Sequence, residues 1–194
     1  MKTVYKLTDQ RMLTYGGCQW ALGEWKETSG EGERCGPGWL YFYSDPLLSV
    51  LLNPIHGDFA NPRLFRGEAT GKSLDDCGLK VGYSRARLVE EIPVPVVSAH
   101  QAVRFGILCA MEVYDVPEWR VWADGWLSGK DQTTAAANAN AEAAAWAAWA
   151  AAKANAEAAA AAAKAAAAAK AAWVQPLDLV GLAKRALEEE EARK

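Results

Sequence analysis

An alanine-rich segment constrains this chain more than any other feature, because 28 of the 39 residues from Ala135 to Trp173 are alanine. Alanine is the strongest helix former but buries little apolar surface, so this segment cannot build an ordinary hydrophobic core. No Gly or Pro occurs between Lys130 and Pro176. The segment therefore predicts one continuous α-helix over residues 132–173, roughly 60 Å long at about 1.5 Å per residue.

The larger side chains of this predicted helix fall along one stripe, which includes Glu142, Trp146, Trp149 and Lys153. Alanine faces hold a tertiary contact only where two helices approach closely over many residues. We therefore expect this helix to pack against another copy or against its own domain, with a homo-oligomer favoured and Trp146, Trp149 and Trp173 as interface candidates. An isolated spacer rod and a break near Asn155 are the alternatives.

The composition divides the chain into three predicted segments. Residues 1–130 hold most of the Gly and Pro and are expected to form an α+β globular domain, a small, mostly antiparallel sheet with buried helices. Residues 131–175 form the long alanine-rich helix. Residues 176–194 contain a short amphipathic helix, predicted over Leu177 to Glu191, whose acidic end is a solvated face.

Alternating side chains and turn residues predict the strands of the sheet. The last of them alternates most clearly, since Val81, Tyr83, Arg85 and Arg87 fall on one face. The predicted strands are Lys2 to Leu7, Gln19 to Lys26, Trp39 to Tyr43, Leu64 to Thr70 and Leu79 to Glu91.

Capping residues predict where the helices begin. Asp45 before Pro46 predicts a two-turn helix from Pro46 to Leu52. Ser98 with Gln101 is a capping-box pattern, which predicts a buried helix over Ala99 to Tyr114. A further helix, opened by Pro117, carries Trp119, Trp122 and Trp126 on one stripe. This stripe is expected to pack in the core, with an exposed docking face as the alternative.

Charge and cysteine usage exclude several classes of protein. Residues 1–130 carry 14 Lys and Arg against 16 Asp and Glu, and the remainder carries 7 against 8, so neither bulk nucleic-acid binding nor an anionic membrane surface is expected. The first residues lack the apolar core of a secretory signal, and lysines interrupt the alanine segment, so a cytoplasmic protein with no membrane span is expected. The four cysteines form no Cys-x-x-Cys pair, which favours reduced thiols and no metal; a zinc site of Cys18, Cys35 and His56 is the alternative.

One region carries residues suited to binding an anion. A His-Asp pair in the loop after residue 53, followed by arginines and by an Arg-bearing strand next to Tyr83, can hold phosphate and stack on a ring. The alternative is that these arginines are solvated and only balance nearby acids. No nucleophile elbow, P-loop or dinucleotide fingerprint accompanies them, so no catalytic residue and no cofactor is predicted. The ligand-binding candidates are Tyr41, His56, Asp58, Arg63, Arg66, Arg85 and Arg87.

The N-terminal part resembles a family of uncharacterised phage and prophage proteins over about residues 4–92. That family has a Met followed by a Gly-Phe-Gln-Tyr-like segment, a Cys, a Gly-Phe-His-like segment and a Pro-Leu helix start, often before a low-complexity repeat. Here Leu40 stands where the family often has His, so an activity that needs this histidine is not expected. The matching residues are Met12, Gly17-Cys18-Gln19-Trp20, Gly23, Cys35, Gly38-Trp39-Leu40 and Asp45-Pro46-Leu47.

The resemblance implies a phage accessory protein that acts in the cytoplasm of a bacterial host. We expect a non-enzymatic protein that binds a host protein or a nucleotide-type signal and so counteracts host defence. One alternative is a small ADP-ribosyltransferase-like enzyme, since a turn, an aromatic strand, a short helix and Arg-bearing strands follow one another as in such domains. The other is a self-assembling scaffold built on the long helix.

Overall fold

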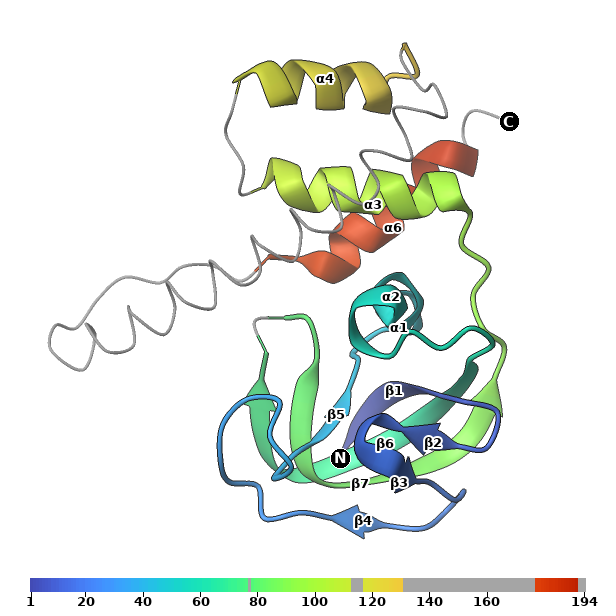
Figure 1. The fold of residues 1–194 in the computed structure, drawn as a ribbon, viewed down its shortest axis with the longest axis vertical. Helices are drawn as coiled ribbons and strands as arrows, with labels where there is room; N and C mark the ends of the chain where they lie inside the picture. The colour runs from blue at the N-terminus through green and yellow to red at the C-terminus, as the bar shows by residue number, and fades with distance from the viewer. Residues whose placement is uncertain (77, 113–116, 131–176, 192–194) are drawn as a thin grey trace, which may run out of the picture. The chain divides into compact units, whose positions relative to one another are not determined.

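The computed structural model describes residues 1–76, 78–112, 117–130 and 177–191 (Figure 1). The chain forms two compact units, residues 1–96 and residues 97–194. Each unit is described by itself. The predicted α+β class is confirmed, because the first unit is built on an antiparallel sheet and helices occur in both units.

The first unit is a curved antiparallel sheet around one long hairpin. Its two long strands pair along most of their length, with irregularities between Arg66 and Gly67 and between Thr70 and Ser73. The remaining strands add to the two edges of this hairpin in the order β1-β6-β7-β4, while β5 also pairs with β7. The strands are β1 (Lys2–Thr8), β4 (Lys26–Glu27), β5 (Leu40–Phe42), β6 (Arg63–Asp75) and β7 (Val81–Ile92).

A single bridge closes the sheet on itself. The N–H groups of Tyr5 and Tyr43 each donate to the other residue's carbonyl, at 2.9 Å, so the end of β5 is joined back to β1. The strands β1, β6, β7 and β5 therefore follow one another around a ring, which we call the closed sheet (Figure 1).

The interior of the closed sheet is an apolar core with a large aromatic share. Trp20 and Phe42 pack edge to face, with ring centres 5.6 Å apart. Gly67 is buried, and the position requires glycine because an added Cβ would lie 2.6 Å from the Arg87 carbonyl oxygen. The buried residues of this core are Val4, Trp20, Leu40, Phe42, Phe65, Ala69, Ala86 and Leu88.

Two short helices follow β5, and the capping signal predicts only the first, since the second lies where a loop is expected. Helix α1 (Pro46–Leu51) begins after Asp45, whose carboxylate accepts the Leu47 N–H at 2.8 Å. It contacts β1 and buries Leu48 and Leu52. Helix α2 (Asn53–His56) follows at once, since Pro54 needs no N–H partner in a first helical turn.

Helix α3 (Ala99–Met111) is the centre of the second unit. The predicted capping box is present, since Ser98 accepts the Gln101 N–H and the Gln101 side chain accepts the Ser98 N–H. Every residue from Val103 to Ala110 is buried, so this helix needs cover on more than one side. Helices α4 (Pro117–Leu127) and α6 (Leu179–Glu191) both contact it.

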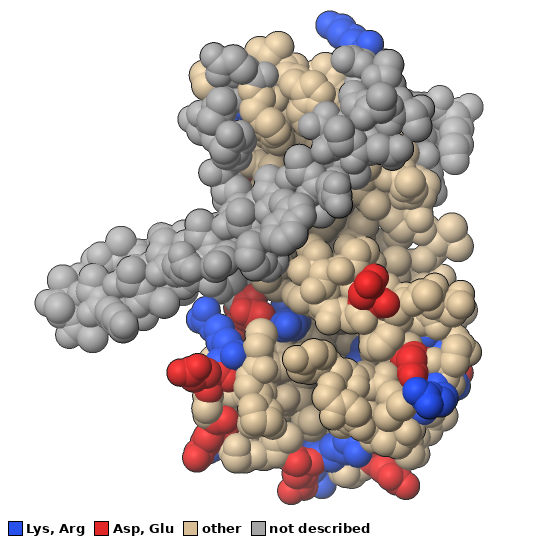
Figure 2. Space-filling model, viewed as in Figure 1, with Lys and Arg blue, Asp and Glu red and all other residues tan. Residues whose placement is uncertain are grey.

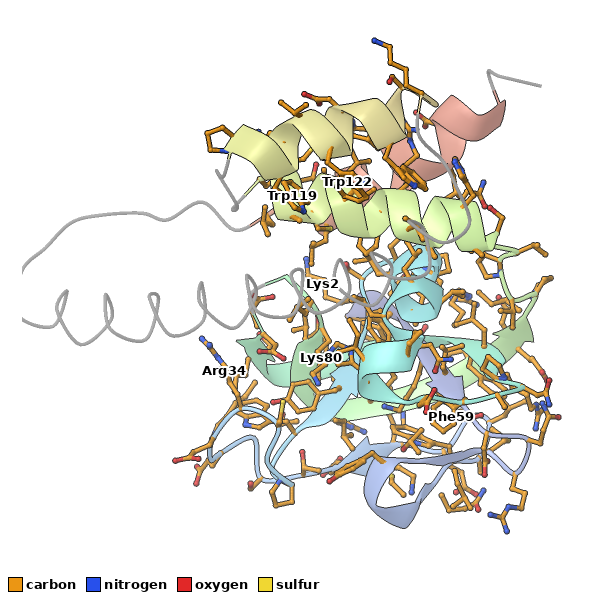
Figure 3. The ribbon with its side chains drawn as sticks, turned by 45° about the horizontal axis from the view of Figure 1, so that its top comes forward. Lys2, Arg34, Phe59, Lys80, Trp119 and Trp122 are labelled. Carbon is orange, nitrogen blue, oxygen red and sulfur yellow. The ribbon has the colours of Figure 1, made fainter. Side chains whose placement is uncertain are left out.

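The tryptophan stripe of α4 belongs to this packing. Trp119 and Trp122 project from α4 on the side that faces α3 (Figure 3), and Trp126 is 1% exposed. They form a cluster with Val103 and Ile107 of α3. The core-packing prediction is thus confirmed, and the docking-face alternative is wrong.

One predicted strand is wrong. Residues 19–26 do not form a single strand, because Gln19 ends β3 (Cys18–Gln19), which pairs with β2 (Leu13–Thr14) outside the main sheet. A short 3-10 turn (Tyr15–Gly17) joins those two strands. The chain then places Trp20 in the core and turns at Gly23, whose φ of +78° suits glycine. The alternation of apolar and polar residues around Trp20 therefore comes from one buried aromatic side chain between two turns and not from a strand.

The boundaries of the two compact units differ from those of the three predicted segments. The expected boundary at residue 130 falls inside the second unit, and α6, expected as a separate C-terminal segment, packs on α3 there. The alanine-rich helix over 131–175 and its candidates Trp146, Trp149 and Trp173 lie outside the described residues. Among the described residues, no helix is long and apolar enough to cross a membrane.

Candidate functional site

A pocket of about 310 Å³ lies in the first unit, where β1, β5 and α2 meet. Its walls are largely aromatic, and two lysines from separate parts of the chain reach it. Figure 3 labels two of its residues, Lys80 from the turn before β7 and Phe59 from the segment after α2. The lining residues are Lys6, Leu7, Thr14, Tyr15, Cys35, Tyr41, Phe42, Tyr43, Asn53, Ile55, His56, Gly57, Phe59 and Lys80.

Lys6 enters this pocket from inside the closed sheet. It stands two residues after the buried Val4 on β1 and opposite the buried Phe65 of β6, so its side chain occupies a core position. Its Nζ donates to the Tyr41 carbonyl at 2.6 Å and lies 4.8 Å from the ring centre of Phe42. The ring centre of Trp20 lies 5.3 Å from the same Nζ.

These surroundings change the chemistry of the amine. Burial lowers the pKa of Lys6 from 10.5 to about 8, and Lys80 adds a smaller lowering. Among the described residues, no carboxylate forms an ion pair with Lys6. The Cys18 thiol acts against this lowering, but a cation held by a carbonyl and two rings without a carboxylate is still poorly compensated, so an anion in the pocket would be attracted to it.

Tyr43 and His56 form a hydrogen-bonded pair in the same pocket. The Tyr43 Oη and His56 Nδ1 lie 2.9 Å apart, and the two rings stack with centres 5.9 Å apart. Tyr43 is fixed by the bridge that closes the sheet, and His56 by the last turn of α2. Burial raises the pKa of Tyr43 and lowers the pKa of His56 from 6.5 to about 4. Both groups are therefore neutral at physiological pH.

We expect the imidazole of His56 to titrate with a midpoint near pH 4, well below an ordinary histidine at about 6.5. The reason is burial, since the protonated ring would lose its hydration and sit in a pocket that already holds lysines. NMR of the ring protons during an acid titration measures this. A His56→Asn variant, which removes one set of ring signals, assigns the signals of the two histidines. A His56 midpoint at 6 or above would contradict a buried ring.

Lys80, Tyr41 and Cys35 form the rim of the pocket. The Lys80 Nζ lies 5.0 Å from the ring centre of Tyr41 and 3.9 Å from Oδ2 of Asp76. The Tyr41 hydroxyl accepts the Cys35 N–H at 2.7 Å. Cys35 has a φ of +61°, an uncommon value for a residue with a Cβ, and this hydrogen bond helps to hold it there. The rim thus carries a positive charge, paired with Asp76, beside the half-buried ring of Tyr41.

Two of the predicted ligand residues, Tyr41 and His56, line this pocket, but Asp58 and the four arginines do not. Asp58 is exposed after α2 with a φ of +48°. The arginines lie along the sheet in ion pairs, as the alternative interpretation expects. On the face that Figure 2 shows, positive side chains of the first unit lie beside negative ones. The pairs are Arg63–Glu91 at 2.6 Å, Arg66–Glu90 at 2.7 Å, Arg85–Glu27 at 3.0 Å and Arg87–Glu68 at 2.7 Å.

The structure groups Arg85 and Arg87 with Trp25 instead of with Tyr83. Both guanidinium groups pack on the ring of Trp25, at 4.5 and 4.8 Å, whereas Tyr83 packs against the core of the closed sheet. Ligand binding by this pair stays a prediction, but their charges are already matched by Glu27 and Glu68.

Sequence reasoning missed Lys6, Tyr43 and Lys80. A signal for Lys6 exists, because it stands in phase with Val4 on a strand whose inward face is apolar, so a charged residue occupies a core position. Nothing local marks Tyr43 or Lys80, which reach the pocket only through the folding of β5 and β7 around it. In the described ranges, no group of three or more His, Cys, Asp or Glu could hold a metal ion.

Comparison of the chain with protein families, curated proteins and solved structures finds no match. The resemblance to phage accessory proteins therefore stays a prediction. The proposal of a function is therefore based on the geometry of the pocket.

Proposed function

We propose that the first unit is a binding module for a small anionic ligand that carries a ring, of the nucleotide type. The observation that carries this proposal is the meeting of two lysines, Lys6 and Lys80, in one pocket with aromatic walls. Lys6 has no carboxylate partner among the described residues, so its charge is available to a ligand.

An anionic ligand would compensate for the buried charge of Lys6. Placing the Lys6 ammonium among Phe42 and Trp20 removes much of its hydration, and a single carbonyl contact replaces only part of it. A bound phosphate or carboxylate would restore the lost stabilisation through a charge-assisted hydrogen bond. Lys80, close to Asp76, supplies a second and weaker contact at the rim.

The aromatic side chains in the pocket lining favour a ligand that carries a ring. Aromatic surface comes from Tyr41, Tyr43 and Phe59, and the second ring nitrogen of the neutral His56 can form a hydrogen bond to a ligand. The volume of about 310 Å³ is at the lower end of the range for small-molecule sites, which favours a ligand of mononucleotide size or smaller.

Such a module fits the role that the resemblance implies. An accessory protein that retains a nucleotide-type signal without turning it over would lower its free concentration in a bacterial host and so counteract a defence that depends on it. No catalytic residue is needed for this role. A host protein as the partner is the outcome to consider if no small ligand binds.

Calorimetry with mono-, di- and cyclic nucleotides and with NAD tests the proposal, on the parent and on a Lys80→Met variant. We expect one nucleotide to bind and the variant to bind about 10-fold more weakly, since the loss of one charged contact at the rim costs about 1.4 kcal/mol. Lys72→Met is the matched control, because Lys72 lies on β6 and pairs with Glu31 outside the pocket.

Three outcomes decide between the candidates. No binding by the parent, or equal binding by Lys80→Met, overturns the proposal. Consumption of NAD, seen by chromatography of the same samples, would favour the ADP-ribosyltransferase-like enzyme instead. Native mass spectra of the purified chain report any retained ligand, and they also report the copy number that the alanine-rich segment is expected to raise.

A further inference from the structure

Lys6 differs from the other pocket lysine in what surrounds its amine. The Nζ of Lys6 contacts the Tyr41 carbonyl and the rings of Phe42 and Trp20. Lys80, by contrast, lies 3.9 Å from a carboxylate oxygen of Asp76. The exposed Lys72 has a similar partner in Glu31, at 3.0 Å. A carboxylate holds the proton on an amine, whereas apolar surroundings favour the uncharged form.

We propose that Lys6 is a covalent attachment site for small aldehydes that carry a negative charge, with its amine and the aldehyde carbon joined as an imine. The place of Lys6 in the lining of the pocket, on the inner side of the closed sheet and with no carboxylate ion pair among the described residues, carries this proposal. The second lysine, Lys80, would attract the negative group of the aldehyde. The proposal uses the same pocket as the proposed function but does not require that nucleotides bind.

The availability of the uncharged amine supports this reactivity. With a pKa of about 8, roughly a tenth of Lys6 is uncharged at pH 7, whereas an ordinary lysine at 10.5 has several hundred-fold less free amine. A lower pKa also makes an amine a somewhat weaker nucleophile, which offsets part of this gain. A desolvated lysine in an apolar pocket is nevertheless the usual environment of an imine-forming residue.

The reaction balances without any oxidant, reductant or cofactor. The amine lone pair attacks the aldehyde carbon, the carbonyl oxygen takes a proton, and the nitrogen loses one, which gives a carbinolamine. Loss of the hydroxyl as water, with the second proton of the nitrogen, forms the C=N bond. Amine and aldehyde thus give imine and water. When the imine is protonated, its one N–H can still donate to the Tyr41 carbonyl, and its positive charge stays near the Phe42 and Trp20 rings.

Trapping by reduction tests the proposal on the full chain. The parent is mixed with 4-formylbenzoate and cyanoborohydride at pH 7.5, and peptide mass spectrometry follows the adduct on each lysine with time. We expect Lys6 to be modified at least 10-fold faster than Lys72. The rate at Lys6 should level off above about pH 8.

The control is the same reaction in guanidinium chloride, where the preference should vanish because the pocket is gone. Modification of Lys6 no faster than Lys72 in the native chain overturns the proposal, as does a preference that survives denaturation. The two proposals fail separately. If no nucleotide binds but Lys6 is still trapped preferentially, the proposed function is wrong and the attachment site stands; if a nucleotide binds and Lys6 is inert, the reverse holds.

Discussion

Replacing Trp20 with Ala should lower the free energy of unfolding of the first unit by about 3–5 kcal/mol, the loss expected when a large aromatic leaves a packed core. Trp20 is 2% exposed, packs edge to face on Phe42, and donates its Nε1–H to the Thr14 hydroxyl at 3.1 Å.

Trp25→Ala is the matched control for this prediction. Trp25 is five residues away and only half-buried, since it lies on the outer side between Arg85 and Arg87. Its loss removes two cation–π contacts at an exposed site, worth about 1 kcal/mol together. Native-state hydrogen exchange of the β6 and β7 amides measures the first unit separately from the second. Equal losses for the two variants would contradict the assignment of Trp20 to the core.

Replacing Lys6 with Met should change how stability depends on pH. The pKa of Lys6 is about 8 in the folded chain and 10.5 in an unfolded one, so between these values the unfolded chain holds a proton that the folded chain has released. Stability of the parent therefore rises with pH across this window, by on the order of 3 kcal/mol, and the cost of burying the cation is fully present below pH 8.

The Met side chain has neither this cost nor the hydrogen bond to the Tyr41 carbonyl, which is worth about 1 kcal/mol. We expect the Lys6→Met variant to be about 1–2 kcal/mol more stable than the parent at pH 7. It should be less stable at pH 10.5, where the folded parent amine is uncharged and most of the cost of burying the cation is gone. Urea denaturation at several pH values measures the difference. Lys72→Met should follow the parent at every pH, and parallel curves for parent and Lys6→Met would show that Lys6 is not desolvated.

Much of the fold could be predicted because its signals are local. Asp45 with Pro46, and Ser98 with Gln101, mark helix starts through hydrogen bonds that span two or three residues, and both helices begin where expected. The hairpin of β6 and β7 shows itself by alternation within each strand. The strand predicted over residues 19–26 failed because alternation around Trp20 comes from one buried ring between turns, and a short window cannot tell these apart.

The candidate site could be predicted only in part. Tyr41 and His56 were found because aromatic and polar residues gather near them in sequence. The arginines were chosen for their chemistry, but cross-strand pairing matches Arg66 with Glu90 and Glu68 with Arg87, and register between strands cannot be read from either strand alone.

The sequence by itself determined the starts of α1 and α3, the strand-forming segments of β1, β5, β6 and β7, and the continuous apolar character of α3. Only the tertiary structure decided that α6 returns to cover α3, and that a bridge between Tyr5 and Tyr43 closes the sheet. Capping and alternation act over a few residues, whereas closure depends on which distant edges bury the most apolar surface together. That closure places Lys6 inside, and so it creates the pocket.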